Sequence, residues 1–253
     1  MQQSSLISQI YRIIRIVIHT IIGLIIAAIF LPVLSENAKK KLIKWWCGGL
    51  LHAFHIKVVT FGKLPPATTK GVMFVANHIS WSDIHALNSK IALRFIAKAE
   101  IRNWPIFGYL AHKANPLFID RGKRQVASKI VAITAASLAQ GDNLCFFPEG
   151  TTTDGTQVLR FKSSVIQAAI NVNSLIWPVA IRYINGDGSI NTAMAYAGEK
   201  GLIESMQQVI KKRNATVELH FLEPIETTGK DRRELTLAAY NTIVAKLALQ
   251  RHL

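Results

Sequence analysis

The sequence predicts an α/β domain, with a mixed central sheet flanked by helices, preceded by a membrane-associated helical segment. Two observations predict this arrangement. Short apolar stretches of strand length alternate with longer amphipathic stretches from residue 56 to residue 253, which is the pattern of layered α/β folds. A twenty-residue run without Lys, Arg, Asp or Glu, residues 16–35, lies near the start. We therefore divide the chain into N-terminal membrane-anchoring helices (1–55) and an α/β domain (56–253).

The apolar run is long enough to anchor the chain in a bilayer. As a helix, its twenty residues extend about 30 Å, the thickness of the hydrocarbon core. A cleaved secretory signal is the alternative, but the run is long for a signal core and no small-x-small cleavage site follows it. Arg12 and Arg15 precede the run and Lys39–Lys41 follow it, so the positive-inside rule assigns no orientation. Cations at both ends also suit a helix that dips into the membrane or lies at its surface.

The next segment, KKKLIKWWCGGLLHAFH (39–55), has the composition of an interfacial helix. Trp45 and Trp46 belong to the residue type that is enriched at membrane–water interfaces, and the lysines suit lipid phosphates. An ordinary amphipathic helix packed on the domain is the alternative for this segment.

The remaining elements follow in order along the chain. Strands are predicted where short stretches are apolar or alternating and rich in β-branched and aromatic residues: 57–61, 72–76, 93–99, 115–120, 143–147, 174–183 and 216–225. Helices are predicted where apolar residues recur every three or four positions: 83–89, 104–113, 123–140, 163–172 and 234–253. Gly141 suits the C-cap of the third of these helices.

The charge balance indicates an anionic partner. Thirty Lys and Arg stand against fifteen Asp and Glu, so the formal net charge is +15, while half of the residues are hydrophobic. Nucleic acid and the anionic face of a membrane are the two usual partners of so basic a chain. The long apolar run and the lack of a recognition motif favour the lipid membrane, so we expect no nucleic-acid partner.

Cys47 and Cys145 have no metal-ligand or CxxC spacing, which favours a reducing cytosol and, for Cys145, a buried thiol.

The stretch NHISWSD (77–83) carries an imidazole and a carboxylate five positions apart. It follows the predicted strand 72–76, at the kind of strand end where catalytic groups of open α/β sheets project. A turn between His78 and Asp83 brings the carboxylate within hydrogen-bond reach, where it fixes the imidazole tautomer and steadies the protonated ring. Ser82 is predicted as the N-cap of the helix that follows. The alternative for His78 is a structural histidine in a loop.

A second stretch, FFPEGTTTDG (146–155), ends another buried strand. Pro148 stops the strand, and Gly150 allows a sharp turn whose exposed N–H groups suit an anion or a developing oxyanion. Glu149 places a carboxylate in the same turn. A plain strand-ending turn with a surface glutamate is the alternative.

Taken together, these stretches resemble the glycerolipid (lysophospholipid) acyltransferase family, typified by 1-acylglycerol-3-phosphate acyltransferase. Two further blocks are similar to family blocks and lie in the same order: NPLFIDRG (115–122) and WPVAI (177–181). The resemblance covers residues 71–184 and includes the amphipathic N-terminus. Four blocks in the family's order are a specific signal.

The resemblance implies an O-acyltransferase that moves a fatty acyl group from acyl-CoA or acyl-carrier protein to the free hydroxyl of a lysolipid. The first acceptor it implies is 1-acyl-sn-glycerol 3-phosphate, giving phosphatidic acid, with no cofactor or metal besides the acyl donor. The catalytic domain is then expected on the cytosolic face of the inner (cytoplasmic) membrane, where both donors occur.

The family motifs also imply roles for individual residues. His78 is the general base and Asp83 orients it. The residues implied in substrate binding, with the two basic ones facing the acceptor phosphate, are Lys98, Arg121, Glu149, Gly150 and Thr151.

One departure from the family pattern concerns the acceptor. Phosphatidate-forming members commonly carry Arg directly after Glu-Gly-Thr, whereas this chain has Thr152, with Asp154 two positions on. A guanidinium fork is lost and a carboxylate is added. Phosphate recognition then depends on Lys98 and Arg121, assisted by Arg160 or Lys162. A zwitterionic acceptor such as lyso-ornithine lipid, whose amine suits Asp154, is the second hypothesis.

Two other chemistries use residues of the same stretch. A metal hydrolase would need His78, Asp83 and His85 as ligands, but His85 is two positions after Asp83 on a predicted helix, so the two side chains do not share a face. Serine catalysis would need Ser80 or Ser82, and neither lies in a Gly-x-Ser-x-Gly elbow. Catalysis by His78 without an enzyme nucleophile is the interpretation that we carry forward.

Overall fold

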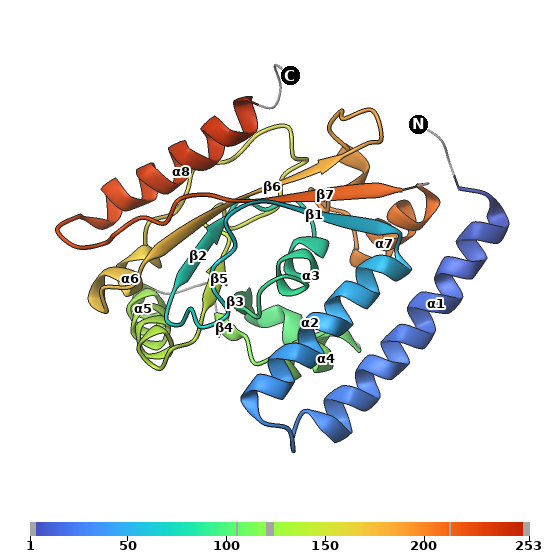
Figure 1. The fold of residues 1–253 in the computed structure, drawn as a ribbon, viewed down its shortest axis with the longest axis horizontal. Coiled ribbons are helices and arrows are strands. Elements are labelled where there is room, and N and C mark those ends of the chain that lie inside the picture. The colour runs from blue at the N-terminus through green and yellow to red at the C-terminus, as the bar shows by residue number, and fades with distance from the viewer. Residues whose placement is uncertain (1–3, 105, 120–123, 213, 250–253) are drawn as a thin grey trace.

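The structure is a computed structural model that describes residues 4–104, 106–119, 124–212 and 214–249. Its centre is a seven-stranded mixed sheet in the order β1-β7-β6-β2-β5-β3-β4, with helices on both faces (Figure 1). All neighbouring strands are parallel except β6 and β7, which are antiparallel. The strands are β1 (Ile56–Gly62), β2 (Met73–Ala76), β3 (Arg94–Lys98), β4 (Leu117–Ile119), β5 (Leu144–Phe146), β6 (Ile176–Ile184) and β7 (Ala215–Phe221). The predicted mixed α/β fold is confirmed.

Side chains of the central strands alternate between two apolar cores, as the pleat of a sheet requires. Phe74 and Ala76 of β2 face a core shared with α2 (Glu36–Ala53), α3 (Ser82–Asn88) and α7 (Leu202–Lys211). Met73 and Val75 face the second core, which is shared with α5 (Arg124–Ala139), α6 (Ile166–Asn171) and α8 (Arg232–Leu249). Because both faces are covered, β2 is buried along its whole length, which explains its unbroken apolar sequence.

The chain begins with a helical hairpin. Helix α1 (Leu6–Ile25) continues into a π-helical turn (Ile26–Phe30), and α2 returns beside it, as the blue ribbons of Figure 1 show. Within the described part of the chain, Leu6–Phe30 is the one helix long and apolar enough to cross a membrane. The helix begins ten residues before the predicted run, because residues 6–15 are also apolar at helical spacing and Arg12 points inward.

Specific polar contacts bind this hairpin to the domain and its helices to each other. Arg12 is 2% exposed and donates to the carbonyls of Ile210, at 3.1 Å, and Lys212, at the end of α7. The indole Nε1 of Trp46 donates to the His19 carbonyl at 3.1 Å, while His19 Nε2 lies 2.8 Å from the Trp46 carbonyl. Helix α1 therefore lies along the domain with one face buried.

The predicted strands and helices agree with the structure to within a few residues at their ends, with one omission. Helix α7 is missing from the prediction because it is short and five of its ten residues are polar: Glu204, Ser205, Gln207, Gln208 and Lys211. Helix α4 (Phe107–Lys113) lies within the predicted 104–113 and follows a 3-10 helix, Ala99–Asn103. Another 3-10 helix, Thr192–Met194, lies after β6.

Candidate active site

Two loops meet at the carboxyl edge of neighbouring parallel strands. Strands β2 and β5 pair directly, so the loop after Ala76 and the loop after Phe146 leave the sheet side by side. Functional groups of open α/β sheets gather at this edge. The structure thus brings together the two sequence stretches that are seventy residues apart.

Asn77 fixes the first loop to the sheet. Its amide Nδ2 donates to the Ile181 carbonyl at 2.9 Å, and its Oδ1 accepts from the Ile181 N–H at 2.7 Å. The side chain therefore occupies both hydrogen-bonding groups of one residue of β6, and it is buried. This reciprocal pair determines where His78, the next residue, leaves the sheet.

His78 and Asp83 form the predicted pair. The His78 Nδ1 lies 2.8 Å from Asp83 Oδ2. Because a carboxylate only accepts, this bond places the proton on Nδ1 and leaves Nε2 as an acceptor. The imidazole is 18% exposed, whereas Asp83 is fully buried. Phe147, from the second loop, stacks on the imidazole at 3.8 Å between centroids with an interplanar angle of 7°, which fixes the ring plane.

Four donors hold the Asp83 carboxylate. Besides the His78 ring, Oδ2 accepts from the N–H groups of Ile79, at 2.8 Å, and Ser80, at 2.9 Å. Oδ1 accepts from the Tyr183 hydroxyl at 2.7 Å. These bonds offset the cost of burying the charge. Sequence reasoning missed Tyr183, which lies a hundred positions away on β6, because no local pattern marks a partner so remote in the chain.

The Tyr183 hydroxyl is itself fixed by a serine. Ser82 Oγ lies 2.8 Å from Tyr183 Oη and 3.0 Å from Ser80 Oγ, and all three residues are buried. Burial, with Asp83 beside it, raises the pKa of Tyr183 well above its usual value, so the phenol stays protonated as a donor. The predicted N-cap role of Ser82 is wrong: α3 already begins at Ser82, and its hydroxyl faces Tyr183 rather than the helix N–H groups.

Glu149 joins the two loops. Its Oε1 accepts from the backbone N–H of His78 and its Oε2 from that of Leu159, each at 2.7 Å. The side chain is 4% exposed. Burial raises the pKa of Glu149 to about 7, although the two N–H bonds oppose the shift. This geometry makes Glu149 a positioning group for His78. Its implied part in acceptor binding stays a prediction.

The residues after Glu149 form the turn that the sequence predicts. Gly150 has φ +76°, a conformation that favours glycine, and Thr151 is exposed. Thr152 donates to the Tyr196 carbonyl. Asp154 accepts from Thr156 N and Oγ1 at 2.9 and 2.7 Å, and these bonds lower the pKa of its exposed carboxyl. The loop thus presents a carboxylate close to the position where the family pattern has a guanidinium.

Of the residues predicted to bind the acceptor phosphate, the structure describes Lys98, Arg160 and Lys162. Lys98 is the last residue of β3, and its backbone pairs with Ile119 of β4. Arg121 lies outside the described residues. Arg160 and Lys162 are exposed on the segment after the Glu149 turn, where the Lys162 N–H donates to the Pro148 carbonyl at 3.0 Å. Both cations therefore belong to the same loop as Glu149.

His85 does not join His78 and Asp83. Its Nδ1 lies 3.6 Å from Cys47 Sγ, and its ring packs edge-on against Trp46. Burial lowers the pKa of His85 to about 4, so the ring is neutral at physiological pH. Among the residues that the structure describes, no three His, Cys, Asp or Glu side chains are gathered as in a metal site. Cys145 is a buried free thiol, as predicted.

An apolar cavity lies on the other side of α3. It has a volume of about 200 Å³ and lies between the α1–α2 hairpin and helices α3, α4 and α7. Trp81, which directly precedes α3, and Ile84 and His85 of α3 form one wall, so the same helix carries Asp83 and borders the cavity. Trp46, Leu110 and Met206 contribute from α2, α4 and α7. We refer to it below as the apolar cavity.

The sequence of this site matches known enzymes. A sequence model of the acyltransferase family matches residues 55–182, which include both loops. The chain belongs to the acyltransferase family. The enzyme is 35% identical over 211 residues to the lyso-ornithine lipid O-acyltransferase of Pseudomonas aeruginosa, covering 83% of this chain and 79% of that protein.

Relatives that act on a different acceptor are also similar. The enzyme is 33% identical over 174 residues to the 1-acyl-sn-glycerol-3-phosphate acyltransferase of Neisseria meningitidis, covering 69% of this chain and 68% of that protein. The fold matches the crystal structure of the Thermotoga maritima acyltransferase PlsC with a TM-score of 0.66 at 20% identity, covering 95% and 98% of the two chains. The enzyme is therefore an acyltransferase of the lysophospholipid acyltransferase family.

Proposed function

We propose that the enzyme transfers a fatty acyl group from an acyl thioester to the hydroxyl of a lysolipid at a membrane surface, with His78 as general base. The observation that carries this proposal is the 2.8 Å contact between His78 Nδ1 and Asp83 Oδ2. It leaves Nε2 of a partly exposed imidazole as a proton acceptor at the carboxyl edge of the sheet.

The reaction follows from this geometry. Nε2 of His78 takes the proton of the lysolipid hydroxyl while that oxygen attacks the thioester carbonyl carbon. The resulting imidazolium is stabilised by Asp83, which stays ionised. When the C–S bond breaks, the thiolate leaves and takes the proton from Nε2, which restores the neutral ring. No covalent acyl-enzyme is required, and Ser80 and Ser82 are buried and hydrogen-bonded to each other.

For the acceptor, we propose lyso-ornithine lipid. The family motifs put lysophosphatidate first, and we place it second. Thr152 stands where phosphatidate-forming members commonly have Arg, and its hydroxyl is engaged with the Tyr196 carbonyl. The exposed Asp154 carboxylate suits the cationic amine of an ornithine headgroup. The similarity to the Pseudomonas lyso-ornithine lipid enzyme also covers more of the chain than the similarity to the Neisseria enzyme.

The hairpin α1–α2 supports membrane association without a span. Large apolar side chains remain exposed along α1, among them Leu6 at 73% and Ile7 at 81%, and such a continuous apolar surface marks a membrane or protein contact. Crossing the bilayer would require α1 to break the Arg12 hydrogen bonds to the end of α7. We therefore propose that α1 lies in one leaflet, with its apolar face in the lipid.

The apolar cavity is our candidate for the acyl chain. Its lining is almost wholly hydrophobic, and it borders the helix that carries Asp83. The part of a fatty chain placed there is shielded from water, which is the main source of binding free energy for an alkyl group. The acyl donor, acyl-CoA or acyl-carrier protein, stays an expectation from the family resemblance.

The test is a direct assay of purified enzyme in mixed micelles. Lyso-ornithine lipid and lysophosphatidate are offered side by side with both acyl donors, and the products are separated by thin-layer chromatography. The proposal predicts acylated product with lyso-ornithine lipid. Turnover of lysophosphatidate alone would refute the proposed acceptor while retaining the reaction type, and no turnover of either lipid would contradict the reaction itself.

A further inference from the structure

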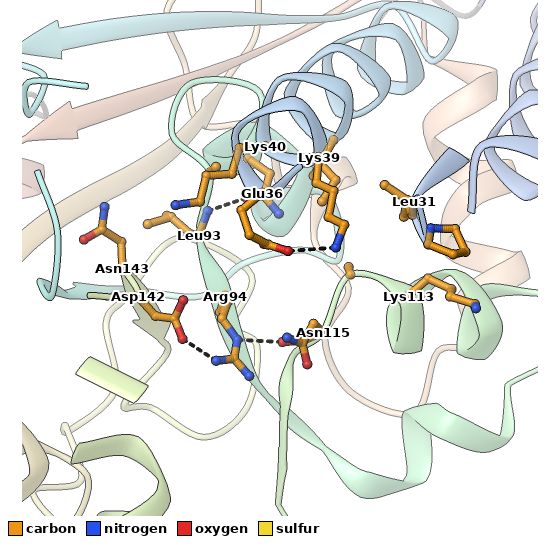
Figure 2. Close-up of a pocket in the computed structure, with 15 residues that line it drawn as sticks. Leu31, Glu36, Lys39, Lys40, Leu93, Arg94, Lys113, Asn115, Asp142 and Asn143 are labelled. Carbon is orange, nitrogen blue, oxygen red and sulfur yellow. Dashed lines mark hydrogen bonds and ion pairs between the residues drawn. The ribbon is translucent and has the colours of Figure 1, made fainter. Parts of the chain in front are cut away.

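A second cavity lies at the opposite edge of the sheet from His78. Its volume is about 250 Å³, and we call it the edge cavity. Arg94 begins β3 and Asn143 directly precedes β5, so these lining residues mark the amino edge of the parallel strands. The start of α2 and the end of α4 complete the wall, as Figure 2 shows.

Cationic side chains outnumber carboxylates around the edge cavity. The charged lining residues are Glu36, Lys39, Lys40, Arg94, Lys113 and Asp142. Both carboxylates are already neutralised. Glu36 pairs with Lys39 at 2.7 Å, and Asp142 pairs with Arg94, as the dashed lines in Figure 2 mark.

Lys40 and Lys113 provide the remaining positive charge. Within the described ranges, neither has a carboxylate within ion-pair distance. The Lys113 ammonium lies 5.5 Å from the centre of the Tyr109 ring, a contact that leaves its charge unneutralised. The two lysines come from different elements, α2 and α4, and both line the cavity. Figure 2 shows the two lysines on opposite sides of the cavity, with the Lys113 side chain directed away from Lys40. Each ammonium ends a flexible four-carbon stem that can turn towards an anion with several acceptor oxygens, such as a phosphate.

The surroundings of the edge cavity indicate where that phosphate comes from. Leu31 and Pro32, in the turn of the α1–α2 hairpin, form part of the lining. Next to them, Ile29, Phe30 and Val33 are 60%, 46% and 79% exposed. Large apolar side chains clustered at such exposure are expected in lipid rather than in water. The edge cavity therefore lies beside the part of the hairpin that enters the membrane, at the level of the lipid headgroups.

We propose that the edge cavity binds the phosphate of an anionic bilayer phospholipid, held by Lys40 and Lys113. The acyl chains of that lipid stay in the bilayer beside the hairpin turn. This proposal rests on the membrane association proposed above, and it adds a specific lipid site to it.

The edge cavity lies where a bound lipid can attach the α1–α2 hairpin to the membrane. Helix α2 has 18 residues, a length of about 27 Å. Its end at Phe54 packs on Trp81, in the loop that carries His78, with ring centroids 5.0 Å apart, whereas the edge cavity lies at its start. A lipid bound at the start of α2 fixes the hairpin to the bilayer at the end remote from the catalytic loop. The bound phosphate and the apolar face of α1 together hold the hairpin at the lipid surface, and the Phe54–Trp81 contact links the hairpin to the loop that carries His78.

The experiment measures binding of the full-length protein to vesicles of phosphatidylcholine, with and without phosphatidylglycerol. The test variant is Lys40→Ala/Lys113→Ala. The matched control is Lys41→Ala/Lys44→Ala, which removes the same charge from exposed positions of α2 that do not line the edge cavity. We expect the test variant to lose about 10- to 30-fold of the partition onto phosphatidylglycerol vesicles and the control about threefold or less. Both variants should bind phosphatidylcholine vesicles like the wild type.

Four outcomes would overturn the proposal. Equal losses in the two variants would mean diffuse attraction instead of a site. If inorganic phosphate raises the melting temperature of the wild type but not of the Lys40→Ala/Lys113→Ala variant, and phosphatidylglycerol has no effect, the ligand is free phosphate. If the wild type binds neither vesicle, the membrane association fails and the lipid site fails with it. Binding to phosphatidylcholine without dependence on phosphatidylglycerol refutes the lipid site alone.

Discussion

Replacing Tyr183 with phenylalanine removes one oxygen atom from the support of the His78–Asp83 pair, the proposed catalytic pair. The phenol donates to Asp83 Oδ1 at 2.7 Å in a fully buried position, and the ring itself stays. A hydrogen bond to a charged acceptor contributes about 1.5–3 kcal/mol. If that amount is lost from the transition state, where Asp83 must hold an imidazolium, kcat falls by about 10- to 100-fold. KM should change little, because Tyr183 is buried behind Asp83.

The assay compares initial acyl-transfer rates of the wild type, Tyr183→Phe and a matched control, Tyr240→Phe. Tyr240, on α8, donates to the Val158 carbonyl at 3.4 Å and makes no contact with Asp83, so its loss should leave kcat within about twofold. Circular dichroism and melting temperature check that each variant is folded. A folded Tyr183→Phe enzyme with the kcat of the wild type would refute the positioning role of Tyr183.

Three further predictions concern other parts of the enzyme. Burial raises the pKa of Glu149 to about 7 from an ordinary 4.5, so between these values the folded protein keeps a proton that the unfolded chain has released. The free energy of unfolding of the wild type, relative to that of Glu149→Gln, should therefore fall by at most about 3 kcal/mol as the pH rises from 4.5 to 7. Urea titration of both proteins at each pH measures it. If the difference between their free energies of unfolding does not change with pH, the raised pKa of Glu149 is contradicted. Arg12→Met should lower the free energy of unfolding by about 2–4 kcal/mol and speed proteolysis of α1, because charged hydrogen bonds to the end of α7 are lost; unchanged protease sensitivity would contradict the docking of this helix. Ala111→Leu fills part of the apolar cavity and should shift the preferred acyl donor to a chain about two carbons shorter; an unaltered chain-length profile would place the acyl chain elsewhere.

The fold class was accessible from the sequence, whereas the strand order was not. Strands β2 and β5 stand out because they are buried on both faces and read as short, unbroken apolar runs. Strand β7 lies between β1 and β6, parallel to one and antiparallel to the other, and no local pattern specifies such pairing. Helix α7 escaped prediction because it has only ten residues, half of them polar, and so short a helix depends on tertiary contacts, including those of Arg12 at its end.

In the candidate active site, too, some contacts were predictable from the sequence and others were not. His78 and Asp83 were predictable because a single turn after a strand brings them together. The bonds from Glu149 to the His78 backbone and from Tyr183 to Asp83 join residues 71 and 100 positions apart, so only the folded chain reveals them. The wrong N-cap assignment of Ser82 has the same origin, since the buried phenol of Tyr183 engages the hydroxyl that would otherwise cap α3.

The rate of acyl transfer by His78→Ala tests the central claim most directly. The variant keeps the backbone N–H that donates to Glu149 and removes only the imidazole. Loss of a general base predicts a fall in kcat of about 100- to 10,000-fold, with lysolipid binding and melting temperature close to those of the wild type. A folded His78→Ala enzyme that acylates the lysolipid at the wild-type rate would contradict general-base catalysis by this residue.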